Sequence, residues 1–217
     1  MAERRDMPYI WVTWLTKLLV GENSCEWAAW FKANYDGRSY DKVPSTFDAT
    51  GWQLQHTELL GRVRSEMEEE GKTVFTEGQN SFNLRGRTAV LGGKPDLVTV
   101  SDGVGTVLDA KTGEPSPSHH VQMMIYMYAI PRALLQYRGV TFEGKVVYPD
   151  HEDYVPSKAI DDTFIGNLSN LIQKIASPNP SRRVASGMEC SFCNITAADC
   201  PERIEVTDVG VGDTEDF

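Results

Sequence analysis

A tight reversal at Asp102-Gly103 constrains the fold of this chain more than any other feature of its sequence. The pair stands between one strand-like run at 96–100 and another at 106–111. An Asp-Gly pair in that setting is a strong signal for a two-residue turn between antiparallel strands. The sequence therefore predicts a β-hairpin near the middle of the chain.

The register of this hairpin brings three charged side chains together. Counting outward from the turn places Asp96 directly opposite Asp109, and the Cβ atoms of such a pair are about 4.5–5.5 Å apart. Lys111 follows two residues after Asp109, so it projects from the same face. Two carboxylates this close repel each other unless a cation lies between them. The alternative is a surface hairpin with scattered charges, because Asp-x-Lys often occurs by chance.

Carboxylate ligands of this kind suit Mg²⁺ or Mn²⁺, and the predicted chemistry is metal-assisted hydrolysis of a phosphodiester. The metal would bind a water molecule and a non-bridging phosphate oxygen. Lys111 would orient or deprotonate that water, or neutralise the phosphate in the transition state.

The remaining pattern predicts an α/β domain with a mixed sheet. Helices are expected where apolar residues recur at threes and fours, and short strands where apolar runs lie between glycines. The expected helices are two within 8–35 separated near Gly21, then 51–70, 119–137 with a kink at Pro131, and 161–175. The expected strands are 73–76, 81–84, 88–91, 96–100, 106–111 and 145–148, with loops at 37–50 and 177–181.

Composition and charge fit one domain over residues 1–205. A chain of 217 residues can bury a single continuous core. The net charge of −10 argues against broad, non-specific binding to nucleic acid. Residues 202–217 hold six acidic side chains and one basic, so half of the net negative charge lies in this segment. Residues 206–217 are expected to form an acidic flexible tail. No apolar run approaches the length of a membrane span and no signal-peptide cleavage site is present, so we expect a cytoplasmic protein.

Two segments resemble the core of the PD-(D/E)xK nucleases. They are Gly93-Lys94-Pro95-Asp96 and Leu108-Asp109-Ala110-Lys111-Thr112-Gly113. The Lys-Thr-Gly ending, with Gln122-x-x-x-Tyr126 on the next helix, is similar to the RecB-like branch. The resemblance implies a restriction-endonuclease-like core, with a central mixed β-sheet flanked by helices. It also implies a catalytic set composed of Asp96, Asp109, Lys111, Gln122 and Tyr126.

The same resemblance also implies a metal-binding role for one histidine. RecB-like enzymes carry a helix-borne histidine as a metal ligand upstream of the first aspartate, and His56 takes that place. The implied metal ligands are His56, Asp96, Asp109 and the backbone carbonyl of Ala110. A lone histidine in a helix is otherwise solvated or hydrogen-bonded. The adjacent pair His119 and His120 could contact substrate, but it is not expected to bind metal.

The four cysteines are unevenly spaced. Cys190, Cys193 and Cys200 lie within eleven residues, whereas Cys25 is far upstream. Four thiolates suit zinc or an iron–sulfur cluster, and the alternative is four unrelated buried cysteines. The three-plus-one split resembles the iron–sulfur RecB-like nucleases, namely the AddB nuclease domain and the CRISPR-associated RecB-type exonucleases. That likeness implies a [4Fe–4S] cluster that joins the N- and C-terminal segments.

The implied function is a metal-dependent DNA nuclease, acting as an exonuclease on single strands or duplex ends. Its setting would be CRISPR spacer acquisition beside an integrase complex, or DNA processing in a phage or in repair. Two other classes stay open: a DNA-binding or scaffolding subunit that does not cut, and a zinc-bearing interaction module. Contacts to DNA phosphates are expected from the basic residues Arg62, Arg64, Arg85, Arg87, Lys94, Arg182 and Arg183.

Overall fold

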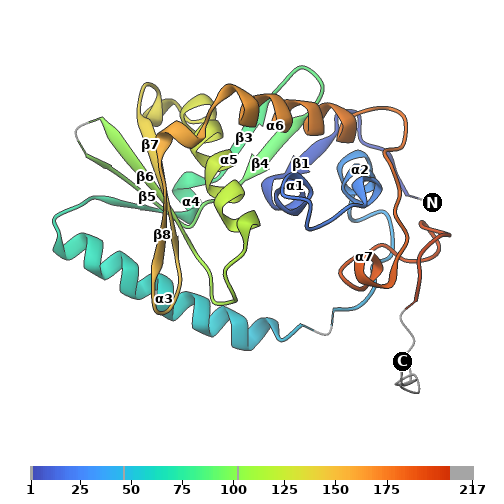
Figure 1. Cartoon of the computed structure of the whole chain (residues 1–217), viewed down its shortest axis with the longest axis horizontal. Coiled ribbons are helices and arrows are strands. Elements are labelled where there is room, and N and C mark those ends of the chain that lie inside the picture. Colours follow the sequence, from blue (N-terminus) through green and yellow to red (C-terminus); the bar gives the residue numbers. More distant parts are fainter. Residues whose placement is uncertain (1, 46, 102, 206–217) are drawn as a thin grey trace, which may run out of the picture.

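A five-stranded mixed sheet organises the structure, a computed structural model that describes residues 2–45, 47–101 and 103–205 (Figure 1). The strand order is β2-β5-β6-β7-β8. Strands β6 and β7 are parallel, and the other neighbours are antiparallel. The strands are β2 (Val74–Thr76), β5 (Leu97–Ser101), β6 (Val104–Ala110), β7 (Thr141–Val147) and β8 (Glu152–Val155).

A smaller sheet has the order β1-β4-β3. Its strands are β1 (Tyr9–Trp11), β3 (Phe82–Arg85) and β4 (Val90–Gly93). Strand β1 runs parallel to β4, and β3 runs antiparallel to it. The N-terminal segment is therefore joined by hydrogen bonds to a strand more than seventy residues later in the chain.

Seven α-helices and two 3₁₀ turns are present in the part of the chain that the structure describes. The helices are α1 (Val12–Leu19), α2 (Glu26–Asn34), α3 (Ala49–Glu69), α4 (Glu77–Asn80), α5 (Pro117–Ala133), α6 (Asp162–Ile175) and α7 (Gly187–Ser191). The 3₁₀ turns are Leu135–Tyr137 and Ser157–Ala159. No helix within the described ranges is long and apolar enough to cross a membrane.

The central hairpin has the predicted register. Strands β5 and β6 pair Leu97 with Leu108 and Ser101 with Val104. Gly103 has a positive φ of 80°, which glycine adopts without the steric cost that a side chain brings, whereas Asp102 lies outside the described residues. The ladder ends at Leu97, so one further step along each strand sets Asp96 against Asp109 as expected.

Two helices cover opposite faces of the large sheet. Successive side chains on a strand point to opposite faces. On β6, Val107 joins the main core, in which α5 supplies Met123 and Ile125. The next residue, Leu108, belongs to a second cluster that holds Leu59, Val63 and Met67 of α3. Helix α5 is also the crossover that a parallel β6–β7 pair requires, and it packs against both of these strands.

The predicted long helices are confirmed, with small shifts at their ends. Helix α3 begins two residues before position 51, where Asp48 caps it by accepting a hydrogen bond from Gly51 N at 3.0 Å. Helix α6 begins one residue after its cap, Asp161. Helix α5 spans 117–133 rather than 119–137. It begins earlier because Ser116 caps it by accepting a hydrogen bond from Ser118 N and Pro117 takes the first helical position, and it ends two residues after Pro131.

Some expectations for the shorter elements were wrong. The segment 8–35 was expected to start as a helix, but Tyr9–Trp11 forms strand β1 first because it finds a partner in β4. The strand expected at 145–148 begins earlier, at Thr141. Strand β8 and the short helices α4 and α7 were not expected. Expected strands at 73–91 correspond to β2, β3 and β4 within about two residues, and the tail at 206–217 lies outside the described residues.

Candidate active site

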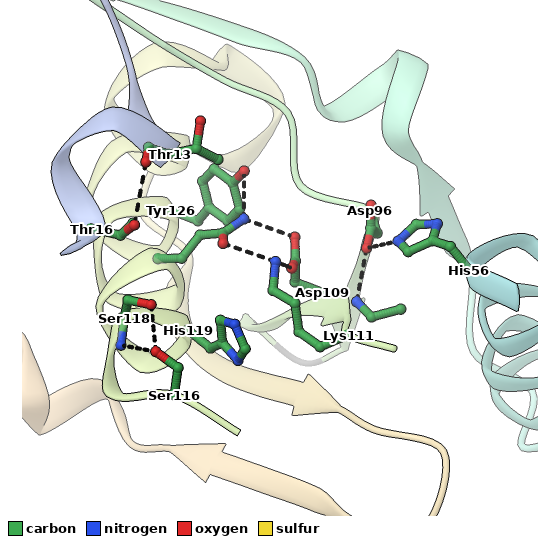
Figure 2. A network of polar contacts seen from close by, with 12 residues as sticks. Thr13, Thr16, His56, Asp96, Asp109, Lys111, Ser116, Ser118, His119 and Tyr126 are labelled. Carbon is green, nitrogen blue, oxygen red and sulfur yellow. Dashed lines mark hydrogen bonds and ion pairs between the residues drawn. The ribbon is translucent and has the colours of Figure 1, made fainter. Parts of the chain in front are cut away.

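A cavity of about 740 Å³ lies beside the point where the hairpin strands end. Every residue of the predicted catalytic and metal-binding sets lines it, although these residues come from α3, the β4–β5 loop, β6 and α5. Figure 2 shows how the side chains approach one another from these elements. The members are His56, Asp96, Asp109, Ala110, Lys111, Gln122 and Tyr126.

Asp109 is at the centre of one hydrogen-bonded network. Its Oδ2 lies 2.6 Å from Lys111 Nζ, and its Oδ1 accepts a hydrogen bond of 3.2 Å from Gln122 Nε2. Gln122 also accepts a bond of 3.0 Å from Lys111 Nζ through its Oε1, and its Nε2 donates to Tyr126 Oη at 3.1 Å. The predicted i, i+4 pair on α5 therefore orients both charged residues at the end of β6.

Asp96 anchors a second group of contacts. Its Oδ2 accepts a hydrogen bond of 2.8 Å from Ala110 N, which fixes the carboxylate against the end of β6. The same oxygen lies 3.2 Å from His56 Nε2 (Figure 2). Helix α3 thus places His56, the residue that the resemblance implied as a metal ligand, beside the first carboxylate.

Burial perturbs the ionisable groups of the cavity. Desolvation raises the pKa of Asp109, which is only 4% exposed, and the adjacent Lys111 ammonium opposes that rise. The hydrogen bond to Asp96 raises the pKa of His56, because a carboxylate partner favours the imidazolium. Desolvation also raises the pKa of Tyr126, which keeps the phenol protonated.

The side chains that line the cavity are of the chemical types that bind a hard divalent cation. Two carboxylates and one imidazole line a single cavity, and oxygen-rich sites of this kind suit Mg²⁺ or Mn²⁺. Asp109 Oδ2 is buried, and its close charged neighbour is the Lys111 ammonium at 2.6 Å. Within the described ranges, no three His, Cys, Asp or Glu side chains converge closely enough to hold a metal ion. The carboxylates instead face Lys111, Gln122, Ala110 and His56.

The sequence did not single out several other residues that line this cavity. Glu77, on the unexpected helix α4, pairs with Lys94 at 2.8 Å. Trp11 and Trp52 also face the cavity. No local motif marks these residues, because their places depend on how distant elements pack.

Of the histidine pair that could contact substrate, His119 lines the cavity and His120 does not. His119 lies in the first turn of α5 with its Nδ1 2.9 Å from Tyr148 Oη. Burial lowers the pKa of His119 to about 4, so it is neutral near pH 7.

The seven basic residues expected to contact DNA do not converge. Lys94 alone among them lines the cavity. Arg62 lies near Pro149 on another surface, and Arg183 pairs with Glu202 at 2.6 Å beside the cysteines. Arg64 pairs with Glu68 on the outside of α3. Arg85 ends strand β3, Arg87 lines a separate groove against α6, and Arg182 donates to Ser24 O. Their role in DNA binding stays a prediction.

All four cysteines line one small cavity of about 60 Å³ between α2 and α7. Each thiol is free. Cys25 precedes α2, so the structure brings it beside Cys190, Cys193 and Cys200 across most of the chain length. Ile204 N donates to Cys190 Sγ at 3.4 Å. The two segments meet at this cavity, and the described cysteines do not form a metal-holding group as placed.

Comparison with protein families identifies the class of this fold and site. The family model described as the PD-(D/E)XK nuclease superfamily matches residues 22–200. The chain belongs to the PD-(D/E)XK nuclease superfamily. The mixed sheet flanked by helices agrees with the restriction-endonuclease-like core that the sequence predicted. Membership suggests nuclease activity, and nucleases of this superfamily generally use Mg²⁺ or Mn²⁺.

The chain was also compared with curated proteins and with solved structures. The comparison with curated proteins finds no match to this chain. Among solved structures, the crystal structure of SSO0001 is similar at 16% sequence identity and a TM-score of 0.48, over 93% of this chain and 89% of that one.

Proposed function

We propose that this chain is a divalent-metal-dependent deoxyribonuclease that hydrolyses phosphodiester bonds. The observation that carries the proposal is the joint placement of Asp96, Asp109 and Lys111 in one cavity, with Gln122 bonded to the last two. Two carboxylates and an ammonium on a rigid hairpin suit stabilisation of charge on a phosphate. A surface hairpin with scattered charges would leave these groups solvated, whereas Asp96 and Asp109 are buried.

Each of these cavity residues has its own role in the proposed hydrolysis. Asp96, Asp109, His56 and the Ala110 carbonyl would hold a divalent cation, which supplies Lewis-acid activation of water and phosphate when bound. Lys111 neutralises charge on the phosphate or orients the attacking water. Gln122 fixes the Lys111 ammonium at 3.0 Å, and Tyr126 in turn bonds to Gln122. The Lys111 ammonium is thus held in place by α5 before substrate binds, which favours electrostatic stabilisation of the transition state.

Replacing Lys111 by alanine tests this proposal. We expect Mn²⁺-dependent cleavage of labelled single-stranded DNA to fall about 100- to 10,000-fold, the range of a lost acid–base or electrostatic group. Lys145→Ala is the matched control, because Lys145 pairs with Glu152 on β8 and does not line the cavity. Equal activity of wild type and Lys111→Ala would refute the proposed site. Wild-type protein that binds DNA but never cuts it, with either metal, would favour the scaffolding alternative.

We propose further that the enzyme acts as an exonuclease on single strands or duplex ends. Of the described Lys and Arg side chains, Lys94 and Lys111 line the cavity, and the body of the chain is acidic. Binding along a long duplex would require many more basic side chains in contact with phosphates. The resemblance to RecB-like nucleases supports a cytoplasmic setting in CRISPR spacer acquisition beside an integrase complex, or in phage or repair DNA processing.

The four cysteines support a second component of the proposal, a [4Fe–4S] cluster. Four thiols around one cavity supply the ligand number of such a cluster, and a backbone N–H donated to Cys190 Sγ is the kind of contact that tunes cluster sulfurs. Lys32, Arg183 and Arg203 line the same cavity and would offset the charge of the thiolates. The cluster would fasten α2 to the segment 190–200, closing a loop around the nuclease core.

Metal content tests this component. Protein purified without oxygen is expected to be brown and to contain iron and sulfide, and Cys193→Ala should lose the colour and unfold at a lower temperature. Met188→Ala is the control, because Met188 lies on the neighbouring helix α7 with 75% of its surface exposed. Colourless wild-type protein that contains zinc would contradict the cluster and support a structural zinc site.

A further inference from the structure

Three aromatic rings form a path from the surface into the catalytic cavity. Phe47 and Trp52 lie with ring centroids 6.2 Å apart, and Trp52 stacks on His56 at 4.9 Å with an interplanar angle of 26°. His56 in turn contacts Asp96. The series leads from the loop before α3 to the first carboxylate of the site. Trp52 and His56 both line the cavity, whereas Phe47 is further out.

These rings are not part of the core. Phe47 is 61% exposed and Trp52 is 40% exposed. Helix α3 is fastened to the sheet by Leu59, Val63 and Met67, which lie further along the helix. Large aromatic side chains left in solvent beside a functional cavity indicate a binding surface for an apolar or planar partner. Because Trp52 borders the catalytic groups, we expect the group that binds the rings to be part of the same molecule as the substrate.

We propose that Trp52, extended outward by Phe47, is a stacking platform for the bases of a single DNA strand whose phosphate lies at Asp96 and Asp109. The inference rests on the proposed nuclease function and names its substrate class. Aromatic side chains stack on unpaired bases of any sequence, whereas the bases inside a duplex have no free face. Stacking needs no positive charge, so it explains how an acidic protein with two lysines in its cavity holds a polyanionic strand.

Binding measured without cleavage tests the platform. Two strands of equal length are compared, one of deoxythymidylate and one of abasic residues, with Ca²⁺ in place of Mn²⁺ so that the carboxylates keep a cation. Each strand is checked to be intact after the measurement. We expect Trp52→Ala to weaken binding of the thymidylate strand about tenfold, the effect of losing one stacked base. The same variant should bind the abasic strand as wild type does. Trp52→Phe should recover most of the affinity, because phenylalanine also offers a ring face.

Leu54→Ala provides the matched control. Leu54 lies on the same helix, is 71% exposed and does not line the cavity, so its removal should change neither strand's affinity. Equal weakening of both strands by Trp52→Ala would overturn the platform, because it would show that Trp52 only supports His56. Unchanged binding of the thymidylate strand would overturn it as well.

The nuclease proposal and the stacking proposal have different failing outcomes. If the wild-type protein cleaves DNA and Trp52→Ala binds the thymidylate strand as tightly as wild type does, the nuclease proposal stands and the stacking platform fails. Wild-type protein that neither binds nor cleaves DNA would remove both.

Discussion

Replacing Asp109 by asparagine should lower the rate of Mn²⁺-dependent DNA cleavage by about 1000-fold or more, the equivalent of about 4 kcal/mol in the barrier. Asp109 is nearly inaccessible to solvent and lies 2.6 Å from Lys111. Asparagine keeps the size of the side chain but removes the charge that would hold the cation and pair with the ammonium. Single-turnover cleavage of a labelled strand measures the effect, and circular dichroism checks that the variant is folded.

The matched control is Asp153→Asn. Asp153 is a carboxylate on β8 that contacts His120 Nε2 at 3.0 Å and does not line the cavity, so its substitution should leave the cleavage rate essentially unchanged. A folded Asp109→Asn protein that cleaves at the wild-type rate would show that the buried carboxylate has no part in the chemistry.

Replacing Leu108 by alanine should lower the free energy of unfolding by about 2–5 kcal/mol. Leu108 is 2% exposed and belongs to the cluster that joins Leu59, Val63 and Met67 of α3 to the sheet. Truncation leaves a cavity under α3, and α3 carries His56. The fold and the site are therefore coupled at this residue. Urea denaturation followed by tryptophan fluorescence measures the change.

Val104→Ala is the control for Leu108. Both are apolar residues of β6, but Val104 is 46% exposed, and a surface truncation of this kind changes stability by only about 0.5 kcal/mol. If Leu108→Ala costs no more than Val104→Ala, the cluster does not hold α3 in place.

The hairpin shows which parts of the structure local sequence can predict. Its register followed from the Asp-Gly pair alone, because a two-residue turn leaves one way to pair the strands. The same count placed Asp96 and Asp109 together. Long helices with strong periodicity or local caps, such as α3 and α6, were predictable for a similar reason. Gln122 and His56 were found through the resemblance to a nuclease family.

The parts that were missed depend on distant partners. Tyr9–Trp11 is extended because β4 pairs with it, and nothing within the segment itself signals that partner. Strand β8 likewise depends on pairing with β7. Glu77 and Trp52 reach the catalytic cavity only because α4 and α3 pack beside the hairpin. Local patterns describe a residue's own element, whereas these positions are properties of the assembled fold.

A crystal structure of the protein with Mn²⁺ would show whether Asp96 and Asp109 share a cation. We expect an anomalous peak in the cavity, bound by oxygens of both Asp96 and Asp109, with the Lys111 ammonium beside it. A fully loaded crystal in which Asp109 keeps only its contacts with Lys111 and Gln122, and in which no manganese lies between the two carboxylates, would contradict this expectation.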